Sequence, residues 1–519
     1  MIAWTHSDWL GHPLIQWPLT AAYLFLLSMI ALYGLHRFWL LWLYRRHLRR
    51  PTRPGAQFNG LPTVTVQLPI YNEGPVATRV IDAVCRLDYP KYRLQIQVLD
   101  DSTDDSQQIA QSRCAHWVSQ GYDVQYRHRA DRHGYKAGAL EAALPHATGE
   151  FIAIFDADFV PRTDFLRQTV HYFTDADVGM VQIRWEHLNR DSSLLTRSQA
   201  IFLDGHFIIE HTARNRSGRW INFNGTAGIW RRDAIVSVGG WKHDTLTEDV
   251  DLSYRAQMAG WRFVFVPDLT CPAELPPEIN AFKSQQHRWT KGSIQTAIKL
   301  LPSLLRSPVP VRIKIEAFFH LTCPMIYLYI TLMALLLFPA IFVNIQFFET
   351  GSMGAIMLGF TLFALGTISA SVYYVASQQA LRHNIMGVVA QLPVLMSVGI
   401  GIALNNSRGV IEALIGHDSP FVRTPKYNIT VNNPTQCPQR RKLHALPSPS
   451  IKLWMSVLEL TLGCYMLECC RLALTIQKTL ISLPFLLLFA SGYFYVGISS
   501  LYQQVLARRV PQTMVAIPE

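Results

Sequence analysis

Long apolar runs lie near both ends of the chain, and a mainly polar stretch separates them. The first run, residues 15–35, is uncharged, and the aromatic segment 39–44 follows it. A helix needs about 20 apolar residues to cross a bilayer, and aromatic side chains favour the bilayer surface, so this pattern predicts a transmembrane helix. Residues 1–16 contain no Lys or Arg, whereas five arginines and no acid lie within residues 45–53. The pattern therefore indicates an uncleaved anchor with its N-terminus outside.

Five further apolar runs follow the polar stretch, each close to the length of a membrane span. They cover residues 315–343, 355–375, 385–404, 453–476 and 480–502. Basic residues flank the run 385–404 on both sides, among them Arg382 before it and Arg408 after it. Positive charge marks the cytoplasmic side, so we expect this run to lie along the interface or to re-enter, which leaves five crossings in the whole chain. The alternative is a sixth crossing, which hydrophobicity alone permits.

Residues from about 60 to 300 alternate between short apolar strands and amphipathic helices, the pattern of an α/β domain with a largely parallel sheet. Three of the predicted strands, at 63–68, 94–99 and 151–155, end in polar sequences. The polar residues at these ends are, in order, Tyr71, Glu73, Asp100, Asp101, Asp156 and Asp158. Ligands of open α/β sheets bind outside the carboxyl ends of the strands, so the sequence predicts a site at this edge.

The composition agrees with a membrane protein that carries a folded domain. Half of the 519 residues are apolar, 16% are charged, and the mean hydropathy is +0.14. These values exclude a disordered chain and a wholly soluble enzyme. The net charge is +11, and its basic residues crowd beside apolar runs, so we expect a lipid bilayer and no nucleic acid as partner. The eight cysteines include no CxxC pair, and we expect them to be reduced.

These patterns divide the chain into five parts. We expect an N-terminal transmembrane anchor in 1–50, a cytoplasmic α/β domain in 51–300, an interfacial helix with two transmembrane helices in 301–384, an interfacial or re-entrant helix with a loop in 385–450, and two transmembrane helices with a short cytoplasmic tail in 451–519. Only ten residues follow Arg509, so no C-terminal cyclic-dinucleotide-binding domain is expected, and such control would come from another protein.

Several acidic and aromatic residues are candidates for chemistry. Asp156 and Asp158, with one Ala between them at a strand end, can direct two carboxylates at one divalent cation, which typically adds phosphate oxygens as ligands. An acid after a strand can instead be only a helix N-cap or a turn former. A capping box would likewise explain Thr247-Glu248-Asp249. Membrane anchoring would explain the Arg and Trp of Gln285-Gln286-His287-Arg288-Trp289.

Taken in chain order, five motifs resemble the D, DxD, TED, QxxRW signature of the membrane-embedded family 2 glycosyltransferases, the cellulose synthase superfamily. They are Asp100-Asp101-Ser102, Tyr135-Lys136-Ala137-Gly138-Ala139-Leu140, Asp156-Ala157-Asp158, Thr247-Glu248-Asp249 and Gln285-Gln286-His287-Arg288-Trp289. Residues 181–185 and 223–231 look most like the plant cellulose-synthase-like A and C groups and their bacterial relatives, which include glucomannan and glucan synthases. The resemblance implies a Rossmann-like α/β domain of the GT-A type and an α-helical transmembrane bundle with interfacial helices.

The resemblance also implies catalytic roles. Asp249, with Glu248 beside it, is expected to be the general base of one inverting displacement that makes a β linkage. Asp156 and Asp158 are expected to hold Mg2+ or Mn2+ at the diphosphate of a nucleotide-sugar donor. Lys136 and Arg288 would add fixed positive charge there.

Further residues are assigned to the donor by the same resemblance. Tyr71, Glu73, Asp100 and Asp101 are expected to surround the nucleobase and the ribose. The segment Phe421-Val422-Arg423-Thr424-Pro425-Lys426 is similar to the gating loop F-x-V-T-x-K, which closes over the nucleotide. Phe421, Thr424 and Lys426 fit this pattern, whereas Arg423 stands where Val is expected.

The acceptor side is assigned in the same way. Trp289 is expected to offer an aromatic face to the acceptor sugar, and Asn224, Gly225 and Thr226 stand at the acceptor-site motif. Asn224 takes the place of the usual Cys, and Arg184-Trp185 also depart from the cellulose-type sequence. Both departures argue against cellulose itself as the product.

The apolar runs after Trp289 are expected, by resemblance, to form a translocation channel. The run 453–476 carries Glu459, Glu468 and Arg471. Such side chains usually face a bundle interior or an aqueous path, and the alternative is that they pair with one another near helix ends.

The function implied is inverting, processive transfer of a hexose to a growing β-linked polysaccharide of the β-1,4-glucan or mannan type, with translocation across the inner membrane. UDP-glucose is the expected donor and GDP-mannose is the alternative. We expect a cytosolic catalytic domain in a multi-pass membrane protein, the nascent polysaccharide as partner, and accessory or periplasmic export subunits.

A second interpretation is a lipid glycosyltransferase acting on ceramide or diacylglycerol. A third, non-enzymatic one is a channel or transporter with an inserted cytoplasmic domain.

Overall fold

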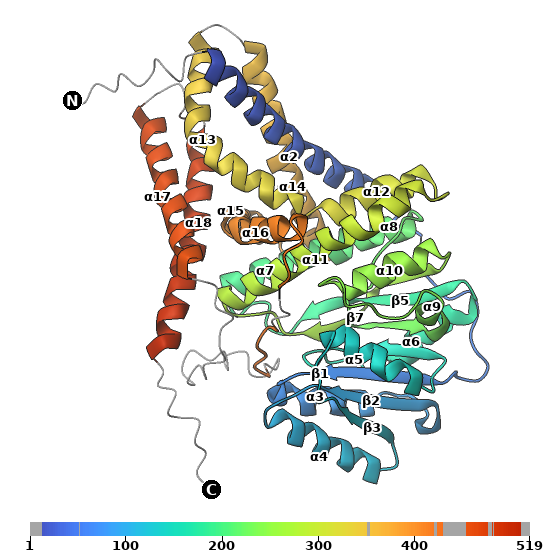
Figure 1. The fold of residues 1–519 in the computed structure, drawn as a ribbon. Coiled ribbons are helices and arrows are strands. Elements are labelled where there is room, and N and C mark those ends of the chain that lie inside the picture. The colour runs from blue at the N-terminus through green and yellow to red at the C-terminus, as the bar shows by residue number, and fades with distance from the viewer. Residues whose placement is uncertain are drawn as a thin grey trace.

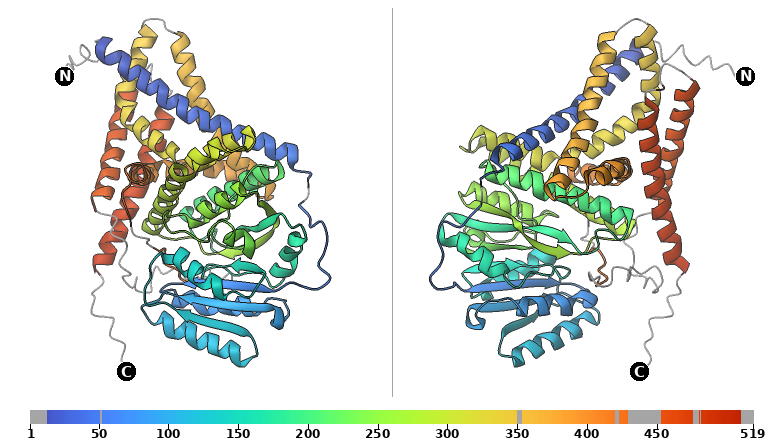
Figure 2. Two further views of the ribbon diagram at one scale, coloured as in Figure 1. Left: turned by 45° about the vertical axis from the view of Figure 1, so that its right-hand side comes forward. Right: turned by 180° about the vertical axis from the view of Figure 1, so that it is seen from behind.

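An α/β domain lies at one end of the molecule and a bundle of long helices at the other (Figure 1). The structure is a computed structural model, and it describes residues 13–50, 52–349, 353–419, 423–428, 453–475, 480 and 482–509. Figure 2 shows from two further sides that the long helices gather beyond one edge of the domain.

The domain is built on a sheet of seven strands in the order β3-β2-β1-β4-β6-β5-β7. The strands are β1 (Val64–Ile70), β2 (Leu94–Asp100), β3 (Asp123–His128), β4 (Phe151–Ile154), β5 (Val178–His187), β6 (Gly228–Arg231) and β7 (Arg262–Ala273). β1 runs parallel to β2 and β4, β2 to β3, and β5 to β7, whereas β6 is antiparallel to both of its neighbours. The predicted Rossmann-like α/β domain is therefore confirmed, with one reversed strand.

β-Branched and apolar residues form the central strands because helices cover both faces of the sheet. The few polar residues there pair across strands: Thr65 Oγ1 donates to Gln95 Oε1 at 2.7 Å, and Gln67 Nε2 donates to Gln97 Oε1 at 3.0 Å. These bonds meet the requirement that buried polar groups be satisfied, and they fix the register between β1 and β2.

Two layers of helices enclose the sheet. The first core includes side chains of α3 (Gly74–Cys85), α4 (Ser106–Ser119) and α6 (Phe165–Thr169). The second includes α5 (Tyr135–Ala143), α9 (Arg232–Val236) and α10 (Glu248–Met258). The domain also has short 3-10 helices at Lys91–Arg93, Leu144–His146 and Val170–Thr174.

A nearly continuous helical segment connects the sheet to the membrane side. It consists of α7 (Leu194–Asp204), a π-helix (Gly205–His211) and α8 (Thr212–Arg216). A capping box starts α7, because Ser193 Oγ accepts a hydrogen bond from Thr196 N while Thr196 Oγ1 accepts one from Ser193 N. The long α11 (Ile279–Arg306) then follows β7.

The remaining helices form the bundle. They are α2 (Pro13–His47), α12 (Val311–Thr322), α13 (Met325–Glu349), α14 (Met353–Ala380), α15 (Ile385–Gly401), α16 (Ala403–Leu414), α17 (Leu453–Thr475) and α18 (Leu483–Arg509). α15 packs closely against α18, since a Cβ on Gly401 would clash with the carbonyl oxygen of Gly492. Glycines at both positions permit this approach.

Within the described residues, four helical segments are long and apolar enough to cross a membrane: 16–47, 357–380, 385–414 and 483–506. A fifth candidate is the bent pair of α12 with the first part of α13, which meet at 55°. The chain is thus membrane-associated. Four of the six predicted apolar runs match these candidates as expected. The run 385–404, predicted to be interfacial, also qualifies by length and composition.

Within the predicted span 453–476, residues 453–475 form α17, which is not among these candidates. Its Glu459 is fully buried and accepts a hydrogen bond from Lys283 Nζ of α11 at 2.6 Å. Glu468 and Arg471 instead pair with each other on an exposed face of the helix. Glu459 therefore faces the interior of the bundle, as the first interpretation predicted. Glu468 and Arg471 pair with each other, as the alternative predicted.

Candidate active site

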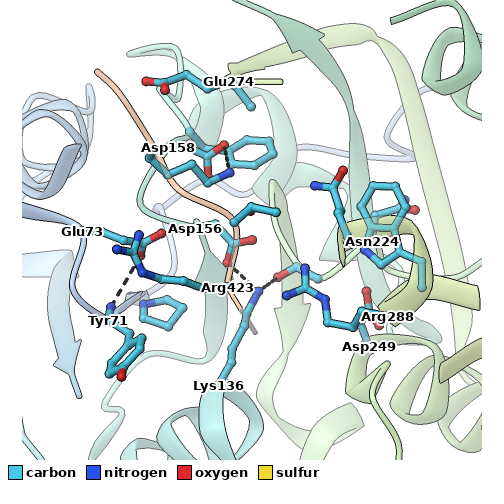
Figure 3. Close-up of a pocket in the computed structure, with 18 of the residues that line it drawn as sticks. Tyr71, Glu73, Lys136, Asp156, Asp158, Asn224, Asp249, Glu274, Arg288 and Arg423 are labelled. Carbon is cyan, nitrogen blue, oxygen red and sulfur yellow. Dashed lines mark hydrogen bonds and ion pairs between the residues drawn. The ribbon is translucent and has the colours of Figure 1, made fainter. Parts of the chain in front are cut away.

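The carboxyl ends of β1, β2 and β4 meet at one edge of the sheet, because the three strands are parallel. Figure 3 shows the cavity at this edge, with Tyr71, Glu73, Asp156 and Asp158 around it. Burial raises the pKa of Glu73 to about 7, and the cations of Lys426 and Arg423 oppose this effect. Short turns after the parallel strands β1 and β4 thus bring these groups together, as the sequence predicted.

The two acids after β2 differ in position. Asp101 lines the cavity and accepts two hydrogen bonds from Arg129, at 2.8 Å from Nε and 2.6 Å from Nη2. Asp100 is fully buried, does not line the cavity, and accepts hydrogen bonds from Ser102 N at 2.9 Å and Tyr126 Oη at 2.7 Å. Asp100 therefore fixes the turn that carries Asp101.

Each aspartate of the DxD motif is paired with a lysine. Lys136 Nζ, near the start of α5, donates to Asp156 Oδ1 at 2.5 Å and to the carbonyl oxygen of Gly225 at 2.8 Å. Lys426 Nζ donates to Asp158 Oδ2 at 2.8 Å. Burial lowers the pKa of Lys136, but the nearby carboxylates, Asp156 first among them, outweigh it and raise that pKa. Both lysines therefore remain cationic beside the carboxylates.

The DxD motif fits a divalent cation that is shared with a diphosphate. Its two carboxylates line the same cavity, and lysine cations already lie against both. Among the described residues, no group of three His, Cys, Asp or Glu side chains could hold a metal by itself. Two carboxylates plus substrate phosphates are a usual ligand set for Mg2+, so the residues present suit such an ion.

Asp249 and Glu248 lie in the first turn of α10, where Asp249 Oδ1 accepts a hydrogen bond from Val250 N at 2.8 Å. Burial and the neighbouring Glu248 carboxylate raise the pKa of Asp249 to about 7, although Lys136 opposes them. A Cβ on Gly225 would lie 3.0 Å from Asp249 Oδ2, so glycine leaves space beside this carboxylate. The carboxylate has the pKa and the access that a general base needs at neutral pH.

The motif of α11 docks directly against the TED motif. A Cβ on Gly292 would lie 2.6 Å from Thr247 Cγ2, and Gln295 Oε1 accepts a hydrogen bond from Leu246 N at 3.0 Å. These contacts place Arg288 and Trp289 on the cavity wall. Burial lowers the pKa of Arg288, and the carboxylates of Glu248, Asp156 and Asp249 act against this. Motifs about forty residues apart thus form one wall.

The acceptor motif has two members on the cavity and one behind it. Asn224 and Gly225 line the cavity. Thr226 is fully buried, and its Oγ1 accepts a hydrogen bond from Asp156 N at 2.9 Å. Thr226 therefore supports the DxD motif and does not line the cavity, which differs from its predicted place at the acceptor.

The segment that resembles a gating loop forms part of the cavity wall. Arg423, Thr424 and Lys426 line it, whereas Phe421 lies outside the described residues. After the loop, Tyr427 N donates to Glu274 Oε2 at 2.9 Å, and Tyr427 Oη donates to Glu278 Oε1 at 2.6 Å. The loop residue Arg423, which departs from the resemblance, thus adds a further cation to the cavity.

Comparison with known proteins agrees with this geometry. Residues 62–292 match the family described as "Glycosyltransferase like family 2". These residues form a family 2 glycosyltransferase domain. For these residues, the predicted resemblance to family 2 glycosyltransferases and the predicted enzyme class are confirmed.

Two plant proteins are among the most similar relatives of this chain. Glucomannan 4-beta-mannosyltransferase 1 of Oryza sativa subsp. japonica is 41% identical over 259 residues, which is 49% of this chain and 50% of the relative. Glucomannan 4-beta-mannosyltransferase 2 of Arabidopsis thaliana is 42% identical over 254 residues, 48% of each chain. The chain thus spans about half the length of the curated relatives that it matches.

One solved structure similar to this chain is the mannosyltransferase PcManGT from Pyrobaculum calidifontis, determined in complex with GDP-Man and Mn2+. It has a TM-score of 0.49 and 23% sequence identity, and the match covers 76% of this chain and 100% of that one.

The cavity is also lined by residues that were not among the predicted site residues, including Arg132, Trp185, His187 and Glu274. The guanidinium of Arg132 lies 3.4 Å from the ring centroid of Tyr71. Glu274 Oε1 accepts a hydrogen bond from Arg79 at 2.7 Å. Arg132 comes shortly before the Lys136 motif, and that proximity is the one signal in the sequence that could have found it.

Three non-glycine residues beside the cavity have left-handed backbone: Asn72 with φ 52°, Tyr135 with φ 51° and Ala227 with φ 54°. Each directly adjoins a residue of a predicted motif. Such conformations cost about 1–3 kcal/mol and concentrate at functional sites, because the surrounding structure must enforce them. Their position here agrees with a rigid, preorganised site.

Proposed function

We propose that this protein transfers mannosyl residues from GDP-mannose to a growing β-1,4-linked polysaccharide at a membrane. The observation that carries the proposal is the single cavity that contains Asp249, Lys136, Arg288, Trp289 and the DxD motif. The names of the relatives that are 41–42% identical favour mannose over glucose. UDP-glucose, the donor expected from the sequence, is the alternative donor.

The proposed base is Asp249. Its pKa of about 7 leaves a large fraction ionised at neutral pH, so its carboxylate can take the proton of the attacking acceptor hydroxyl. The hydroxyl attacks the anomeric carbon from the side opposite the leaving diphosphate, which inverts the configuration and gives a β linkage. Glu248 supports this role because its charge keeps the pKa of Asp249 high.

The leaving diphosphate gathers negative charge, and the cavity offers cations to receive it. Lys136 and Arg288 supply fixed positive charge, and Arg288 can make forked contacts with phosphate oxygens. Asp156 and Asp158 would hold Mg2+ or Mn2+, which when bound neutralises charge on the diphosphate. Lys426 and Thr424 of the loop would then close over the nucleotide, with Phe421 as a further proposed contact.

The nucleoside end of the donor is proposed to lie at the carboxyl ends of β1 and β2. Tyr71 would face the base, while Glu73 and Asp101 would bind the ribose, and Asp100 would support them from behind. On the opposite side, Trp289 and the Asn224-Gly225 turn, backed by Thr226, would hold the acceptor sugar.

We propose further that synthesis is processive and coupled to export. The catalytic domain would lie in the cytosol, the N-terminus outside, and the bundle helices would guide the polymer across the inner membrane in the five-part arrangement expected from the sequence. A bilayer does not solvate sugar hydroxyls, so a growing polysaccharide needs such a path. The bilayer, the nascent polymer and accessory export subunits are the proposed partners.

Membranes that contain the protein test the proposal when incubated separately with radiolabelled GDP-mannose and UDP-glucose, each with Mg2+, Mn2+ or EDTA. We expect a water-soluble or insoluble polymer from GDP-mannose that an endo-β-mannanase digests and that EDTA abolishes. A polymer from UDP-glucose that only an endo-β-glucanase digests would assign the alternative donor. Label that partitions into organic solvent would contradict a polysaccharide product and favour lipid glycosylation, and no incorporation from either donor would contradict the proposal.

A further inference from the structure

A chain of hydrogen bonds runs from the wall of the cavity into the helix bundle, and His206 lies at its centre. His206 belongs to the π-helix Gly205–His211, in which backbone bonds join residues five positions apart. Its ring therefore lies beside that of His211, with the two Nε2 atoms 3.0 Å apart. π-Helical turns are rare and occur frequently at functional sites.

The acceptors around the His206 ring determine where its protons lie. Nδ1 lies 3.2 Å from Oε2 of Glu210, and Nε2 lies 3.0 Å from Oδ1 of Asn224. An ionised carboxylate and an amide oxygen only accept hydrogen bonds, so each ring nitrogen must carry a proton to bond its neighbour. A histidine with both nitrogens protonated is a cation.

The orientation of the Asn224 amide is fixed independently of His206. Asn222 Nδ2 donates to the carbonyl oxygen of Phe223 at 2.9 Å and to Asn224 Oδ1 at 3.2 Å. A backbone carbonyl only accepts, so the first bond assigns the NH2 group of Asn222, and the second then assigns the oxygen of Asn224. Asn224 Nδ2 in turn lies 3.3 Å from His211 Nε2, which accepts from it. With this amide orientation, only a protonated Nε2 of His206 can bond Asn224 Oδ1.

Glu210 is the counter-ion of the His206 ring. Its Oε1 accepts a hydrogen bond from Tyr373 Oη of α14 at 3.0 Å, and its Oε2 lies 3.4 Å from Arg214 Nη1 of α8. Burial raises the pKa of Glu210, but Arg214 and the hydrogen bond from His206 outweigh burial and hold that pKa well below its ordinary value. Burial lowers the pKa of His211 well below its ordinary value, and the charges of His206 and Arg214 add to this effect, so His211 stays neutral.

The helix α12 of the bundle closes this cluster. Its Glu316 accepts a hydrogen bond from Arg214 Nε at 2.9 Å and lies 3.1 Å from His36 Nε2 of α2. Its His320 shares a hydrogen bond of 2.7 Å between Nδ1 and Tyr254 Oη of α10. Both cations of the cluster thus have a carboxylate beside them, and the cluster joins α2, α12 and α14 to the cavity wall.

The bonded Asn224 lies next to proposed catalytic groups. It lines the cavity, and the carbonyl oxygen of Gly225, which follows it, accepts a hydrogen bond from Lys136 Nζ at 2.8 Å. The backbone of this turn is held separately, because Asn224 N donates to Gln182 Oε1 at 3.0 Å. His206 therefore acts on the side chain of Asn224, while Gln182 holds its backbone.

From these contacts we infer that His206 is a positioning residue whose doubly protonated ring, paired with Glu210, fixes the Asn224 amide at the acceptor side of the cavity. His206 does not itself line the cavity, so it acts through Asn224. Because Glu210 also bonds Tyr373 of α14, the bundle helps to set this part of the site. The inference deepens the proposed function and rests on it for the role of Asn224 toward the acceptor.

Nitrogen NMR of the full chain in detergent tests the protonation of the ring without any sugar substrate. Histidine would be labelled at both ring nitrogens, and the difference between wild type and His206→Asn isolates the signals of His206. At neutral pH we expect two protonated nitrogens for this ring. Glu210→Gln gives a second route to the assignment, because loss of the counter-charge should remove the same signal.

His171→Asn is the matched control for the spectrum. His171 is half-buried like His206 and does not line the cavity. Its Nδ1 accepts a hydrogen bond from Phe58 N at 3.1 Å, so that nitrogen carries no proton. The difference spectrum of this variant should therefore show a neutral ring with one unprotonated nitrogen.

Kinetics with β-1,4-mannotetraose as acceptor tests the positioning role. Asparagine carries its amide nitrogen about where Nδ1 of histidine lies, and glutamine about where Nε2 lies. His206→Asn therefore keeps a donor toward Glu210 but loses the one toward Asn224, whereas His206→Gln keeps the latter. We expect His206→Asn to raise the acceptor KM by about 10-fold, the effect of a lost hydrogen bond from a charged group, and His206→Gln to recover part of this. The donor KM of both variants, and both KM values of His171→Asn, should stay within about twofold of wild type.

Two results would overturn the inference directly: a neutral His206 ring in the spectrum, or a wild-type acceptor KM in His206→Asn. Equal losses in His206→Asn and His206→Gln, together with a lower thermal unfolding midpoint, would also overturn it, because that pattern indicates a purely structural role. Absence of transfer by the wild type would instead contradict the proposed function, and the NMR measurement would still decide the protonation of the ring.

Discussion

Lys426 donates a hydrogen bond to Asp158, Nζ to Oδ2 at 2.8 Å, across 268 residues of chain. The side chains are 11% and 4% exposed, so water screens this ion pair only weakly. The bond joins the segment after α16 to the end of β4 and places a loop cation at the proposed diphosphate site.

Replacing Lys426 with Met should therefore weaken donor binding. A hydrogen bond to a charged group contributes about 1.5–3 kcal/mol, so we expect the KM for the nucleotide sugar to rise by roughly 10-fold or more. Steady-state kinetics over a range of donor concentrations measures this. Lys91→Met is the control, because Lys91 is exposed and does not line the cavity; it donates a hydrogen bond to the carbonyl oxygen of Gln120 and lies over the ring of Tyr122. A donor KM within twofold of wild type would show that the loop does not act on the donor.

The pH profile of transfer should show an acidic limb with an apparent pKa of about 7, the value of Asp249. A base must be ionised to accept a proton, so activity rises as the pH rises through this value. Glu248→Gln removes a negative charge that raises the pKa of Asp249, and we expect the limb to move to lower pH. The profile is measured as kcat/KM between about pH 5 and about pH 9. An acidic limb at the same pH in this variant would show that ionisation of Asp249 does not cause the limb.

Asp249→Asn should stabilise the fold at alkaline pH. The pKa of Asp249 lies above its ordinary value, so between those two values the native state binds more protons than the unfolded state, and stability falls as the pH rises through about 7. Because the carboxylate is only half-buried, we expect a gain of about 1–3 kcal/mol at pH 8, seen as a higher thermal unfolding midpoint. The gain should shrink steadily towards pH 4. The exposed Asp233→Asn is the control, and a midpoint at or below the wild-type value at pH 8 would contradict the raised pKa.

The buried pair of Lys283 and Glu459 should matter more for stability than any surface pair. Both side chains are 0% exposed, and Lys283→Met would leave Glu459 without its counter-charge, at a cost of about 3–5 kcal/mol. Adding Glu459→Leu should recover most of this loss. The thermal unfolding midpoint in detergent measures both effects.

An exposed pair serves as the control for that comparison. Glu468→Gln breaks the bond to Arg471, where the side chains are 48% and 59% exposed, and should change stability by less than about 1 kcal/mol. If the thermal unfolding midpoints of the Lys283→Met and Glu468→Gln variants lie within about one degree of each other, the ion pair between α11 and α17 does not stabilise the fold as predicted.

The edge of the sheet that carries the site could be predicted because β-strand periodicity and polar strand ends are local features. Tyr71, Glu73, Asp156 and Asp158 lie at this edge as predicted. The difference between Asp100 and Asp101 could not be predicted, since it depends on Tyr126 of β3, which bonds Asp100 and turns it inward.

The sequence pattern likewise could not predict that β6 runs antiparallel to its neighbours. This strand has four residues, and its direction is set by the ladders to β4 and β5 on its two sides. Thr226 lies just before β6, and its Oγ1 accepts a hydrogen bond from Asp156 N. A residue predicted at the acceptor site therefore supports the DxD motif instead.

Trp185 and His187 show the limit of motif reasoning most clearly. Their exposure to the cavity depends on how β5, β7 and α7 pack, and no spacing along the chain reports this. The burial of Glu459 against Lys283 depends in the same way on the docking of α17 against α11. Contacts between distant elements, and not local propensity, decided these positions.

The most direct test of the account is transfer by Asp249→Asn, measured with labelled donor and acceptor, beside donor binding measured by equilibrium dialysis. General-base catalysis contributes about 100- to 10,000-fold, so transfer should fall by at least about 100-fold while the nucleotide sugar still binds within about fivefold of wild type. Transfer that persists within about tenfold of wild type would contradict Asp249 as the base, and with it the mechanism built around this cavity.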